Sequence, residues 1–312
     1  MDGALIIDKP AGMTSHDVVA AARRVIGERR VGHTGTLDPF ATGVLVLLVG
    51  RATRLAQFLS GAEKEYEAVI RLGYATDTGD VTGNRLEGAH AKAQRTPSLR
   101  KEEIEAAMAS LRGEIEQIPP MYSAKKIAGR RLYELARRGE EIERTPIRVN
   151  IKTFDISSND NSWFQENKNG TSDLRVRVVC SAGTYVRALA EDFGRQLGIG
   201  AHLADLRRMR VGEFRIADAI TLDRLAEIAE SDSIEPLLIS PSDALSHLPS
   251  IELADHDAQK TLHGIDLPVG TEQTRTWNDR QSVRMCHQDA LIAVGTYEAG
   301  RNFVHPVTVI AK

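Results

Sequence analysis

The chain has 312 residues, of which 42% are hydrophobic and 27% are charged, and its formal net charge is −3. This length and ordinary apolar content predict one large domain plus a small one. The slight acidity excludes a protein that is polycationic as a whole, so any nucleic-acid binding must come from local clusters of Lys and Arg.

Cysteine usage and hydropathy indicate a reducing, aqueous setting. Only Cys180 and Cys286 occur, with no C-x-x-C pair, which argues against a disulfide framework or a cysteine-based zinc site. No apolar stretch reaches membrane-spanning length, and Met1–Gly3 lacks signal-peptide character. We therefore expect a cytoplasmic protein without membrane contact.

The N-terminal part of the chain predicts a strand, a helix and a turn that carries one acid. Ala4–Asp8 is a short apolar strand, and Thr14 is a natural N-cap for the helix after it. The stretch GHTGTLDPFATGVL then leads into an apolar run, Val44–Val49, which predicts a buried strand. Its glycines permit positive φ or close approach of another backbone. Pro39 biases Asp38 toward an extended backbone, although spacing alone favours an ordinary turn-forming role for this Asp.

The next elements alternate between strand and turn patterns. Lys64–Leu72 predicts a strand, and GYATDTGDVTG after it is rich in turn residues, with Asp77 and Asp80 suited to Asx turns. Residues 84–97 have the composition of a solvated connection. Ser98 is then expected to cap a helix that ends at about Leu111.

A strongly basic segment extends from Met121 to Gly139. It contains one acid, Glu134, against six basic residues, Lys125, Lys126, Arg130, Arg131, Arg137 and Arg138. In an acidic protein such a cluster is a candidate phosphate-binding element, and composition alone leaves a solvated helix face as the alternative. Gly129 would suit a hinge.

The C-terminal half predicts further strands and helices. Strand patterns cover 148–156 and 173–180, and we interpret Ser157–Ser172 between them as a surface loop. Ser181–Arg187 predicts a turn that opens a helix, and helix signals return at Thr221–Glu230. Beyond about Ser246, glycines separate short β-like runs at 290–296 and 303–310.

Several of these stretches together resemble the TruB family of pseudouridine synthases, which modify uridine 55 in the TΨC loop of tRNA. The resemblance covers roughly Ala4 to Val211 and rests on IIDKPAGMTSHDVV, GHTGTLDPFATGVL, TDTGD, PPMYSAKKIAGRRLYELARRG, GTYVR and GAHLADLRR. It implies an α+β fold with a mixed, mostly antiparallel central sheet flanked by helices. It also implies a catalytic domain at 1–246, an RNA-binding insertion at about 119–146, and a small β-rich PUA-like domain at 247–312. For this last segment a packing appendage without RNA contact is the alternative.

The resemblance assigns three catalytic residues. Asp38 is the essential nucleophile, Tyr66 stacks on the target uracil and acts as a base late in the reaction, and Arg187 pairs with the Asp38 carboxylate. A positive charge beside Asp38 keeps the acid ionised at neutral pH and directs it at the sugar. Judged from the residues alone, Tyr66 is a core residue and Arg187 a surface helix residue.

It also assigns substrate contacts. His33 helps to hold the target nucleotide out of the RNA stack, Tyr185 lines the pocket, Leu206 contacts the base, and Asp80 joins an ionic network with Arg187. From the residues alone, His33 is an ordinary hydrogen-bonded structural residue.

Further basic residues are expected to contact RNA or to support the site. The basic segment is expected to grip the T-arm through Lys125, Lys126, Arg130 and Arg131. Two kinds of partner are possible for Arg207, Arg208 and Arg210: phosphates of the RNA or carboxylates of the protein. Lys9 and Pro10 are expected to support the catalytic turn.

Isomerising uridine involves no net redox change and consumes no phosphate, so no cofactor and no metal are expected. The expected partner is tRNA, bound at its T-arm and elbow, with no obligatory protein partner and a monomeric enzyme. Two hypotheses of other classes stay open: an RNA-folding module that does not need Asp38, and a subunit of a guide-RNA-dependent pseudouridylation particle. The resemblance favours the stand-alone enzyme, because guide-dependent relatives have the region of Met121–Gly139 reduced. Neither G-x-x-x-x-G-K-[ST] nor G-x-G-x-x-G occurs in the glycine-rich turn, which disfavours a nucleotide-binding loop.

Overall fold

The computed structural model describes residues 1–86, 99–123, 125–127, 129–136, 138–140, 142–157, 163–231, 233–270, 272 and 274–311. The first elements are β1 (Gly3–Lys9), α1 (Ser15–Ile26), β2 (Val31–His33), β3 (Thr42–Val49), the 3-10 helix η1 (Gly50–Leu55), α2 (Ala56–Leu59) and β4 (Lys64–Leu72). The middle elements are α3 (Lys101–Ser110), β5 (Gly113–Gln117), β6 (Lys126–Ile127), β7 (Arg130–Arg131), α4 (Leu132–Ala136), β8 (Ile147–Ile156), β9 (Phe164–Glu166) and β10 (Ser172–Cys180).

The remaining elements form two groups. The first is α5 (Val186–Gln196), β11 (Ala201–Val211), β12 (Phe214–Arg215), η3 (Ile216–Asp218), α6 (Leu222–Ser231), η4 (Glu235–Leu237) and α7 (Pro241–Ala244). The second is β13 (Ser250–Glu252), α8 (Asp255–Leu262), β14 (Leu267–Pro268), β15 (Ser282–His287), β16 (Ala290–Glu298) and β17 (Phe303–Val309).

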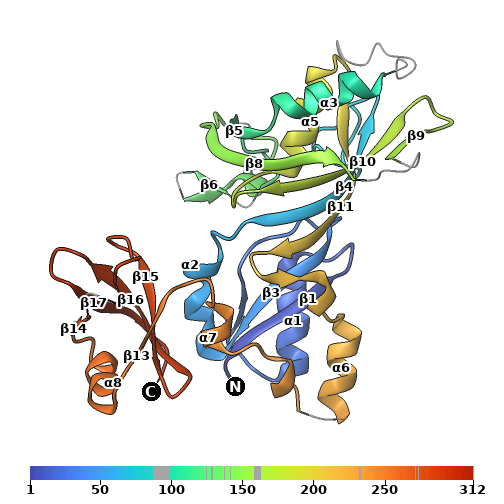
Figure 1. Ribbon diagram of the computed structural model, residues 1–312. Coiled ribbons are helices and arrows are strands. Elements are labelled where there is room, and N and C mark those ends of the chain that lie inside the picture. Colours follow the sequence, from blue (N-terminus) through green and yellow to red (C-terminus); the bar gives the residue numbers. More distant parts are fainter. Residues whose placement is uncertain are drawn as a thin grey trace.

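A ten-stranded mixed sheet runs through most of the described chain, in the order β1-β3-β11-β4-β10-β8-β5, with β2, β9 and β12 paired at its sides. Along this order only the β11–β3 pairing is parallel. That pairing joins the half of the sheet containing β1 and β3 to the half containing β4, β10 and β8 (Figure 1). The α+β class with a mostly antiparallel sheet is therefore confirmed.

Gly43 makes the joint between the two halves possible. Its φ is 101°, and a Cβ added there would collide with the backbone of Arg208 on β11. A residue with a side chain would therefore push β3 away from β11. The catalytic turn predicted between β2 and β3 ends directly at this joint.

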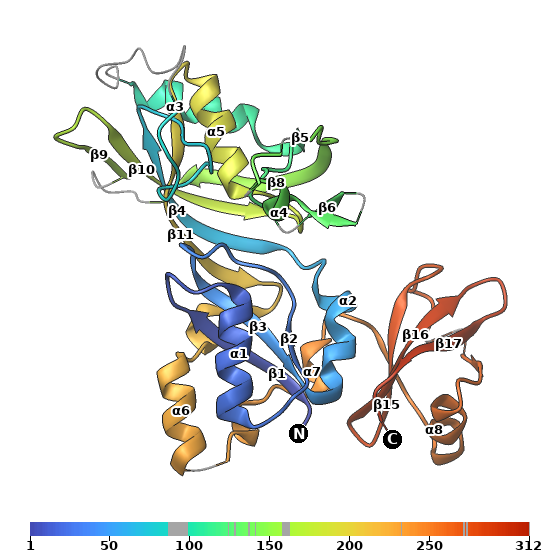
Figure 2. The ribbon, with the colours of Figure 1, turned by 180° about the vertical axis from the view of Figure 1, so that it is seen from behind.

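Helices cover the two halves of the sheet separately (Figures 1 and 2). α3 and α5 pack on the half made by β4, β8, β10 and β11, in a cluster that includes Ile70, Leu174, Phe154 and Phe193. Fully burying side chains of this kind contributes about 1.5–3 kcal/mol each. α1 and α6 pack on β1 and β3, while η1, α2 and α7 cover the opposite face of those two strands.

The C-terminal strands form a second, five-stranded sheet in the order β13-β15-β16-β17-β14. Figure 1 shows it beside α2 and α7, and Leu291, Val294 and Ile310 share a buried cluster with Leu55 of η1. Arg54 Nη1 also donates a hydrogen bond of 2.8 Å to Val309 O. The small β-rich C-terminal domain expected from the sequence is present.

Most strand and helix predictions are confirmed, and α1 begins as expected with Thr14 as N-cap in a capping box with Asp17. The prediction of a surface loop at Ser157–Ser172 is partly wrong, because Phe164–Glu166 forms β9 against β10. β9 has only three residues, and of these only Phe164 packs against the core, so the segment is too short to show strand alternation. Arg100 occupies the N-cap of α3, whereas Ser98 and most of the connection at 84–97 lie outside the described residues.

Candidate active site

A cavity of about 260 Å³ opens where the turn before β3, the start of β4 and the start of α5 meet. Its wall contains five residues selected from the sequence, which come from four separate parts of the chain: Asp38, Tyr66, Tyr185, Arg187 and Leu206. The fold therefore gathers an acid, a guanidinium and two phenol rings around one opening.

The backbone on both sides of Asp38 is held firmly. Ser15 Oγ accepts a hydrogen bond of 2.9 Å from Leu37 N and donates one of 3.2 Å to Leu37 O. Lys9 is fully buried, and its Nζ donates to Pro39 O at 3.2 Å. Burial lowers the pKa of Lys9 to about 8. Because both neighbours of Asp38 are fixed, its carboxylate sits on a rigid support, and Lys9 lies where a supporting residue was expected.

Arg187 forms a bidentate ion pair with the Asp38 carboxylate. Arg187 Nε lies 2.9 Å from Asp38 Oδ2, and Nη2 lies 3.1 Å from Oδ1. Two further donations, to Thr78 O at 2.8 Å and Tyr122 O at 2.7 Å, hold the guanidinium in place. The Arg187 side chain is 4% exposed and that of Asp38 is 32% exposed. The arginine thus lies behind the carboxylate and leaves it open to the cavity, so the surface position inferred from the residues alone is wrong.

The pKa of Asp38 is raised above its ordinary value. Burial is the main cause, Arg187 lowers the pKa through its charge and hydrogen bonds, and the nearby Asp80 raises it. Arg187 therefore orients the carboxylate without fully offsetting the cost of withdrawing it from water. Arg187 thus lowers the pKa in the expected direction, but burial outweighs this effect.

Asp80 is the second carboxylate beside Arg187. Its Oδ2 lies 3.7 Å from Arg187 Nη1, and only 6% of its side chain is exposed. Asp80 Oδ1 accepts hydrogen bonds of 2.9 Å from the Thr82 backbone N–H and the Thr78 hydroxyl. Asp80 is thus both a turn residue and a partner of the arginine, which ties the turn at 73–83 to Asp38.

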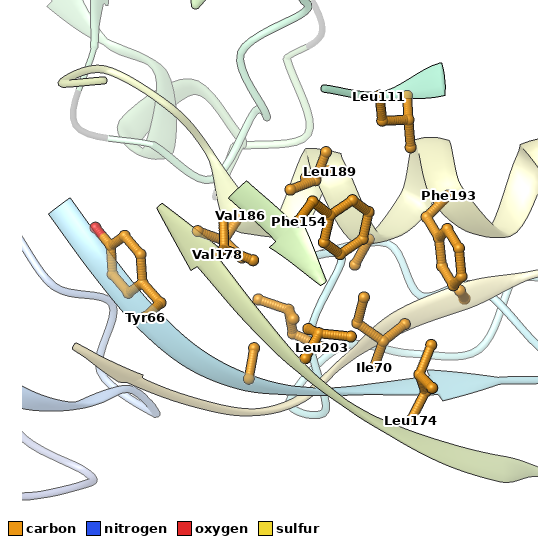
Figure 3. Packing of buried hydrophobic residues seen from close by; sticks show 14 of the residues in the cluster. Tyr66, Ile70, Leu111, Phe154, Leu174, Val178, Val186, Leu189, Phe193 and Leu203 are labelled. Atoms are coloured by element: carbon orange, nitrogen blue, oxygen red, sulfur yellow. The ribbon is translucent and has the colours of Figure 1, made fainter. Parts of the chain in front are cut away.

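Tyr66 closes the hydrophobic cluster at the end near the cavity. Figure 3 shows its ring at one edge of the cluster, with the hydroxyl directed away from Ile70 and Leu174. The side chain is 6% exposed, and burial raises the pKa of the phenol while Arg208 lowers it. Tyr66 is a core residue and a cavity residue at once, so the two interpretations of the sequence are compatible.

Tyr185, the N-cap residue of α5, and Leu206 of β11 complete the wall. Gln117, which is fully buried, brackets the Tyr185 backbone: its Oε1 accepts from Tyr185 N at 3.0 Å and its Nε2 donates to Tyr185 O at 3.3 Å. Leu206 is 4% exposed. Gln117 was not singled out from the sequence, because nothing in its local pattern shows that it reaches across to α5.

His33 lies on β2 outside the cavity wall. Its ring packs edge-on against His16 with centroids 5.3 Å apart. Burial lowers the pKa of His33 to about 4, so the imidazole is neutral near pH 7. Its Nδ1 is buried with no hydrogen-bond partner among the described residues. The structure therefore does not bring His33 together with Asp38 in the cavity.

The basic segment forms a hairpin of β6 and β7 followed by α4, so Lys126 and Arg131 lie on strands. Arg130 is half exposed and pairs with Glu140 at 3.0 Å, so one of the counted charges is compensated. Lys125 precedes β6, and its carbonyl accepts a hydrogen bond of 2.9 Å from Leu132 N. Arg137, and the side chains of Lys126 and Arg131, lie outside the described part of the chain. The segment starts at the site itself, because Ser123 lines the cavity.

The three arginines of β11 have different partners. Arg207 pairs with Asp8 at 2.7 Å, and Arg210 pairs with Glu63 at 2.7 Å. Arg208 is 1% exposed and donates to the backbone carbonyls of Val44, Gly35 and Thr36, at 2.7, 3.0 and 3.4 Å respectively. Arg208 therefore binds the turn between β2 and β3 that carries Asp38, a contact that the run of arginines in the sequence does not reveal.

Within the described ranges, no group of three or more His, Cys, Asp or Glu side chains is placed to hold a metal ion. No helix among the described residues is both long enough and apolar enough to cross a membrane.

Comparison with known protein families gives two matches along the chain. Residues 23–186 match the family described as TruB family pseudouridylate synthase (N terminal domain). Residues 187–245 match the family described as tRNA pseudouridylate synthase B C-terminal domain.

Similar curated proteins carry the name tRNA pseudouridine synthase B. The protein from Geobacillus thermodenitrificans is 47% identical over 264 residues, which cover 85% of each chain. The protein from Geobacillus kaustophilus is 46% identical over 88% of this chain and 94% of its own length. That from Heliobacterium modesticaldum is 40% identical over 95% of this chain and 90% of its own length.

Two solved structures share the fold. A chain in the structure of an H/ACA RNP bound to a substrate RNA containing 2'-deoxyuridine is 25% identical, with a TM-score of 0.71 over 99% of this chain and 85% of that chain. A chain in the crystal structure of a Cbf5-Nop10-Gar1 complex is 26% identical, also with a TM-score of 0.71, over 99% of this chain and 84% of that chain.

Proposed function

The chain belongs to the TruB family of pseudouridylate synthases, and we propose on this basis that it isomerises uridine 55 in the TΨC loop of tRNA to pseudouridine. At the coarser level it is a tRNA pseudouridine synthase with the fold of that family. The observation that supports the finer proposal is the Asp38–Arg187 pair, which presents one carboxylate, held from behind, to a cavity shared with Tyr66.

The reaction needs one reactive carboxylate and a pocket in which the base can turn. Breaking the N1–C1′ bond of uridine, rotating the uracil and joining C5 to C1′ is an internal rearrangement without net redox change. Asp38 is the proposed nucleophile, because its carboxylate is 32% exposed to the cavity while its backbone is pinned. A pinned nucleophile loses little conformational entropy when it reaches the sugar.

The other cavity residues have proposed roles that follow from their positions. Arg187 orients the Asp38 carboxylate, and Asp80 helps to hold Arg187. The Tyr66 ring offers a flat face on which a flipped-out uracil can stack, an interaction worth about 1–3 kcal/mol per base. Tyr185 and Leu206 confine the base from the other sides of the cavity.

RNA contacts outside the cavity supply affinity. The hairpin of the basic segment begins at the cavity edge, so Lys125, Lys126, Arg130 and Arg131 are proposed to meet phosphates of the T-arm. His33 lies outside the cavity wall, and its buried Nδ1 lacks a partner within the described chain. We propose that His33 helps to hold the target nucleotide out of the RNA stack from a position beside the cavity rather than in its wall.

We also propose the division into a catalytic domain at 1–246, with its RNA-binding insertion at about 119–146, and a PUA-like domain at 247–312. The second sheet begins with β13 at Ser250, just after the proposed boundary. We further propose a monomeric enzyme of the cytoplasm that needs no protein partner, cofactor or metal.

A subunit of a guide-dependent particle is the second candidate. One similar chain comes from the structure of an H/ACA RNP bound to a substrate RNA, and it is 25% identical to this one. The relatives named tRNA pseudouridine synthase B are 40–47% identical over at least 85% of the chain. The higher identity supports the stand-alone enzyme.

The test is to incubate the protein with an unmodified tRNA transcript and to map pseudouridine by chemical adduct sequencing. Wild-type protein is expected to modify a single T-loop uridine, and Asp38→Asn is expected to lose at least about 10⁴-fold in rate, as removal of a nucleophile does. Asp173→Asn is the matched control, because it breaks another bidentate pair, with Arg71 at 2.7 Å for both contacts, outside the cavity. Tight RNA binding without product from the wild type would contradict the enzyme and leave the RNA-folding module or the guide-dependent subunit.

A further inference from the structure

Two buried cations, Lys64 and Arg208, line the same cavity as Asp38. Lys64 is 8% exposed and Arg208 is 1% exposed. Within the described part of the chain, no carboxylate forms an ion pair with either, whereas Arg187 faces both Asp38 and Asp80. One wall of the cavity therefore carries positive charge that no neighbouring acid neutralises.

Neutral carbonyl groups hold these two cations in place. Lys64 Nζ donates to Ala62 O at 2.8 Å and to Ser60 O at 3.3 Å. Arg208 donates to three carbonyls of the catalytic turn and β3. Carbonyl oxygens fix the direction of the donors, but they leave the net charge in place. Burial, followed by the charge of Arg208, lowers the pKa of Lys64 to about 8. Burying charge without a counter-charge is unfavourable, so an arrangement of this kind is explained if an anion arrives during function.

The two cations flank the ring on which the uracil is proposed to stack. Arg208 lies directly opposite Tyr66 in the pairing of β4 with β11, and Lys64 lies two residues before Tyr66 on the same face of β4. Both also reach the catalytic turn: a Cβ placed on Gly35 would lie 3.6 Å from Lys64 Cε and 3.8 Å from Arg208 Nη1. The positive charges of Lys64 and Arg208 thus lie beside the position proposed for the uracil. The charge of Arg187, in contrast, lies beside Asp38.

The proposed reaction moves negative charge from Asp38 to the base. When the N1–C1′ bond breaks, its electron pair stays on N1, and the uracil becomes an anion whose charge is shared with its carbonyl oxygens. Asp38 loses its charge in that step, either because its oxygen bonds to C1′ or because it takes the proton from C2′. The C5–C1′ bond then forms with an electron pair of the uracil ring, and Asp38 is released as a carboxylate or returns the proton to C2′. Loss of the C5 proton to a base and protonation of N1 give neutral pseudouridine.

We propose that Lys64 and Arg208 form a cationic wall that stabilises the detached uracil anion, an inference that rests on the proposed function. Preorganised charge aimed at a group that becomes negative only during the reaction accelerates the chemical step more than it tightens substrate binding. Lys64 contacts the base, and Arg208 holds the turn and adds its charge. The competing occupant is an RNA phosphate, which carries its charge before the reaction and would therefore affect binding first.

The test measures single-turnover rates and dissociation constants on a T-arm RNA for wild type, Lys64→Met and Lys64→Arg. Lys64→Met keeps the length of the side chain and removes the charge. It is expected to lower the rate by about 10²–10³-fold while the dissociation constant stays near that of wild type. Lys64→Arg keeps the charge and is expected to recover much of the rate. Lys260→Met, at an exposed lysine of α8 paired with Asp257, is the control for loss of a surface charge.

A second substrate separates stabilisation of the anion from a structural defect. The fluorine of 5-fluorouridine withdraws electrons and makes the uracil a better leaving group, so bond cleavage depends less on the cationic wall. The Lys64→Met defect is expected to be at least about tenfold smaller when consumption of 5-fluorouridine in the RNA is measured. An equal defect on both substrates, or a loss confined to the dissociation constant, would overturn the proposal. If wild-type protein forms no pseudouridine, the proposed function fails instead.

Discussion

Arg187 and Arg208 are both buried beside one cavity, but their charges are met differently. Arg187 is paired with Asp38 and approached by Asp80, so its charge is balanced by acids. Arg208 donates to the carbonyls of Gly35, Thr36 and Val44, and its charge has no acidic partner in the described chain. This difference supports two separate proposed roles. Arg187 positions the nucleophile, and Arg208 stabilises the negative charge that develops on the base.

Replacing Arg187 tests the arginine whose charge is paired with acids. It has the largest expected effect of the four variants considered next. Arg187→Met leaves Asp80 buried without a cation, while Asp38 stays partly open to water. We expect the free energy of unfolding to fall by up to about 3 kcal/mol, measured by urea titration. Because Asp38→Asn removes one of the charges that Arg187→Met leaves unpaired, the double variant should be more stable than the sum of the two single effects predicts. Strict additivity would mean that the pair is not coupled.

Replacing Arg208 tests the arginine that is held by backbone carbonyls and not by acids. Arg208→Lys keeps the positive charge but cannot reach all three carbonyls, so the catalytic turn should be held less firmly. A fall of about 10–100-fold in single-turnover rate is expected from misplacement of Asp38. Arg210→Lys on the same strand, which retains its acidic neighbours Glu63 and Glu65, is the comparison. Equal effects of the two variants would contradict the assignment of Arg208.

The cationic wall also predicts a pH dependence. The pKa of Lys64 is lowered to about 8, so its side chain is charged below that pH and neutral above it. The value of kcat/KM should therefore fall as pH rises through about 8, by close to tenfold for each further pH unit if the charge is essential. Lys64→Arg should remove this alkaline limb, since an arginine stays charged. An unchanged limb in that variant would assign it to another group.

The basic hairpin is expected to show the smallest effect. Arg130 is half exposed and already paired with Glu140, so Arg130→Met should weaken tRNA binding only a few-fold and lower the slope of log K against log salt by about 1. The matched control is Arg224→Met on α6, which breaks a similarly exposed pair with Glu227. A control with the same change in slope would show that Arg130 makes no particular contact with phosphate.

Elements long enough to repeat an apolar face could be predicted from the sequence, and a strand of three residues could not. The strands and helices β3, β4 and α1 follow from apolar spacing, because one face of each is in the core. The strand β9 spans only three residues, of which Phe164 is partly buried against the core while Gln165 and Glu166 are exposed, so it is too short to show an alternating pattern. Asp38, Tyr66 and Arg187 were found through motifs, and the structure places all three at one cavity.

Other site features could not be predicted, because they are contacts across long sequence separations. Gln117 reaches Tyr185 from β5, and Arg208 reaches Gly35 from β11. Nothing in the neighbouring residues distinguishes Arg208 from Arg207 or Arg210. The difference in partners appears only when β11 is aligned in parallel with β3 and opposite β4.

The most direct test of the central claim uses a T-arm RNA that carries tritium at C5 of the uridine corresponding to position 55. Tritium leaves C5 only if the base is rejoined to the sugar at that carbon. We predict that wild-type protein in excess releases about one equivalent of tritium per RNA, and that Asp38→Asn releases none above background while Asp173→Asn behaves as the wild type. Release by Asp38→Asn at the wild-type rate, or no release by any of the three proteins, would contradict the claim that this cavity isomerises that uridine through Asp38.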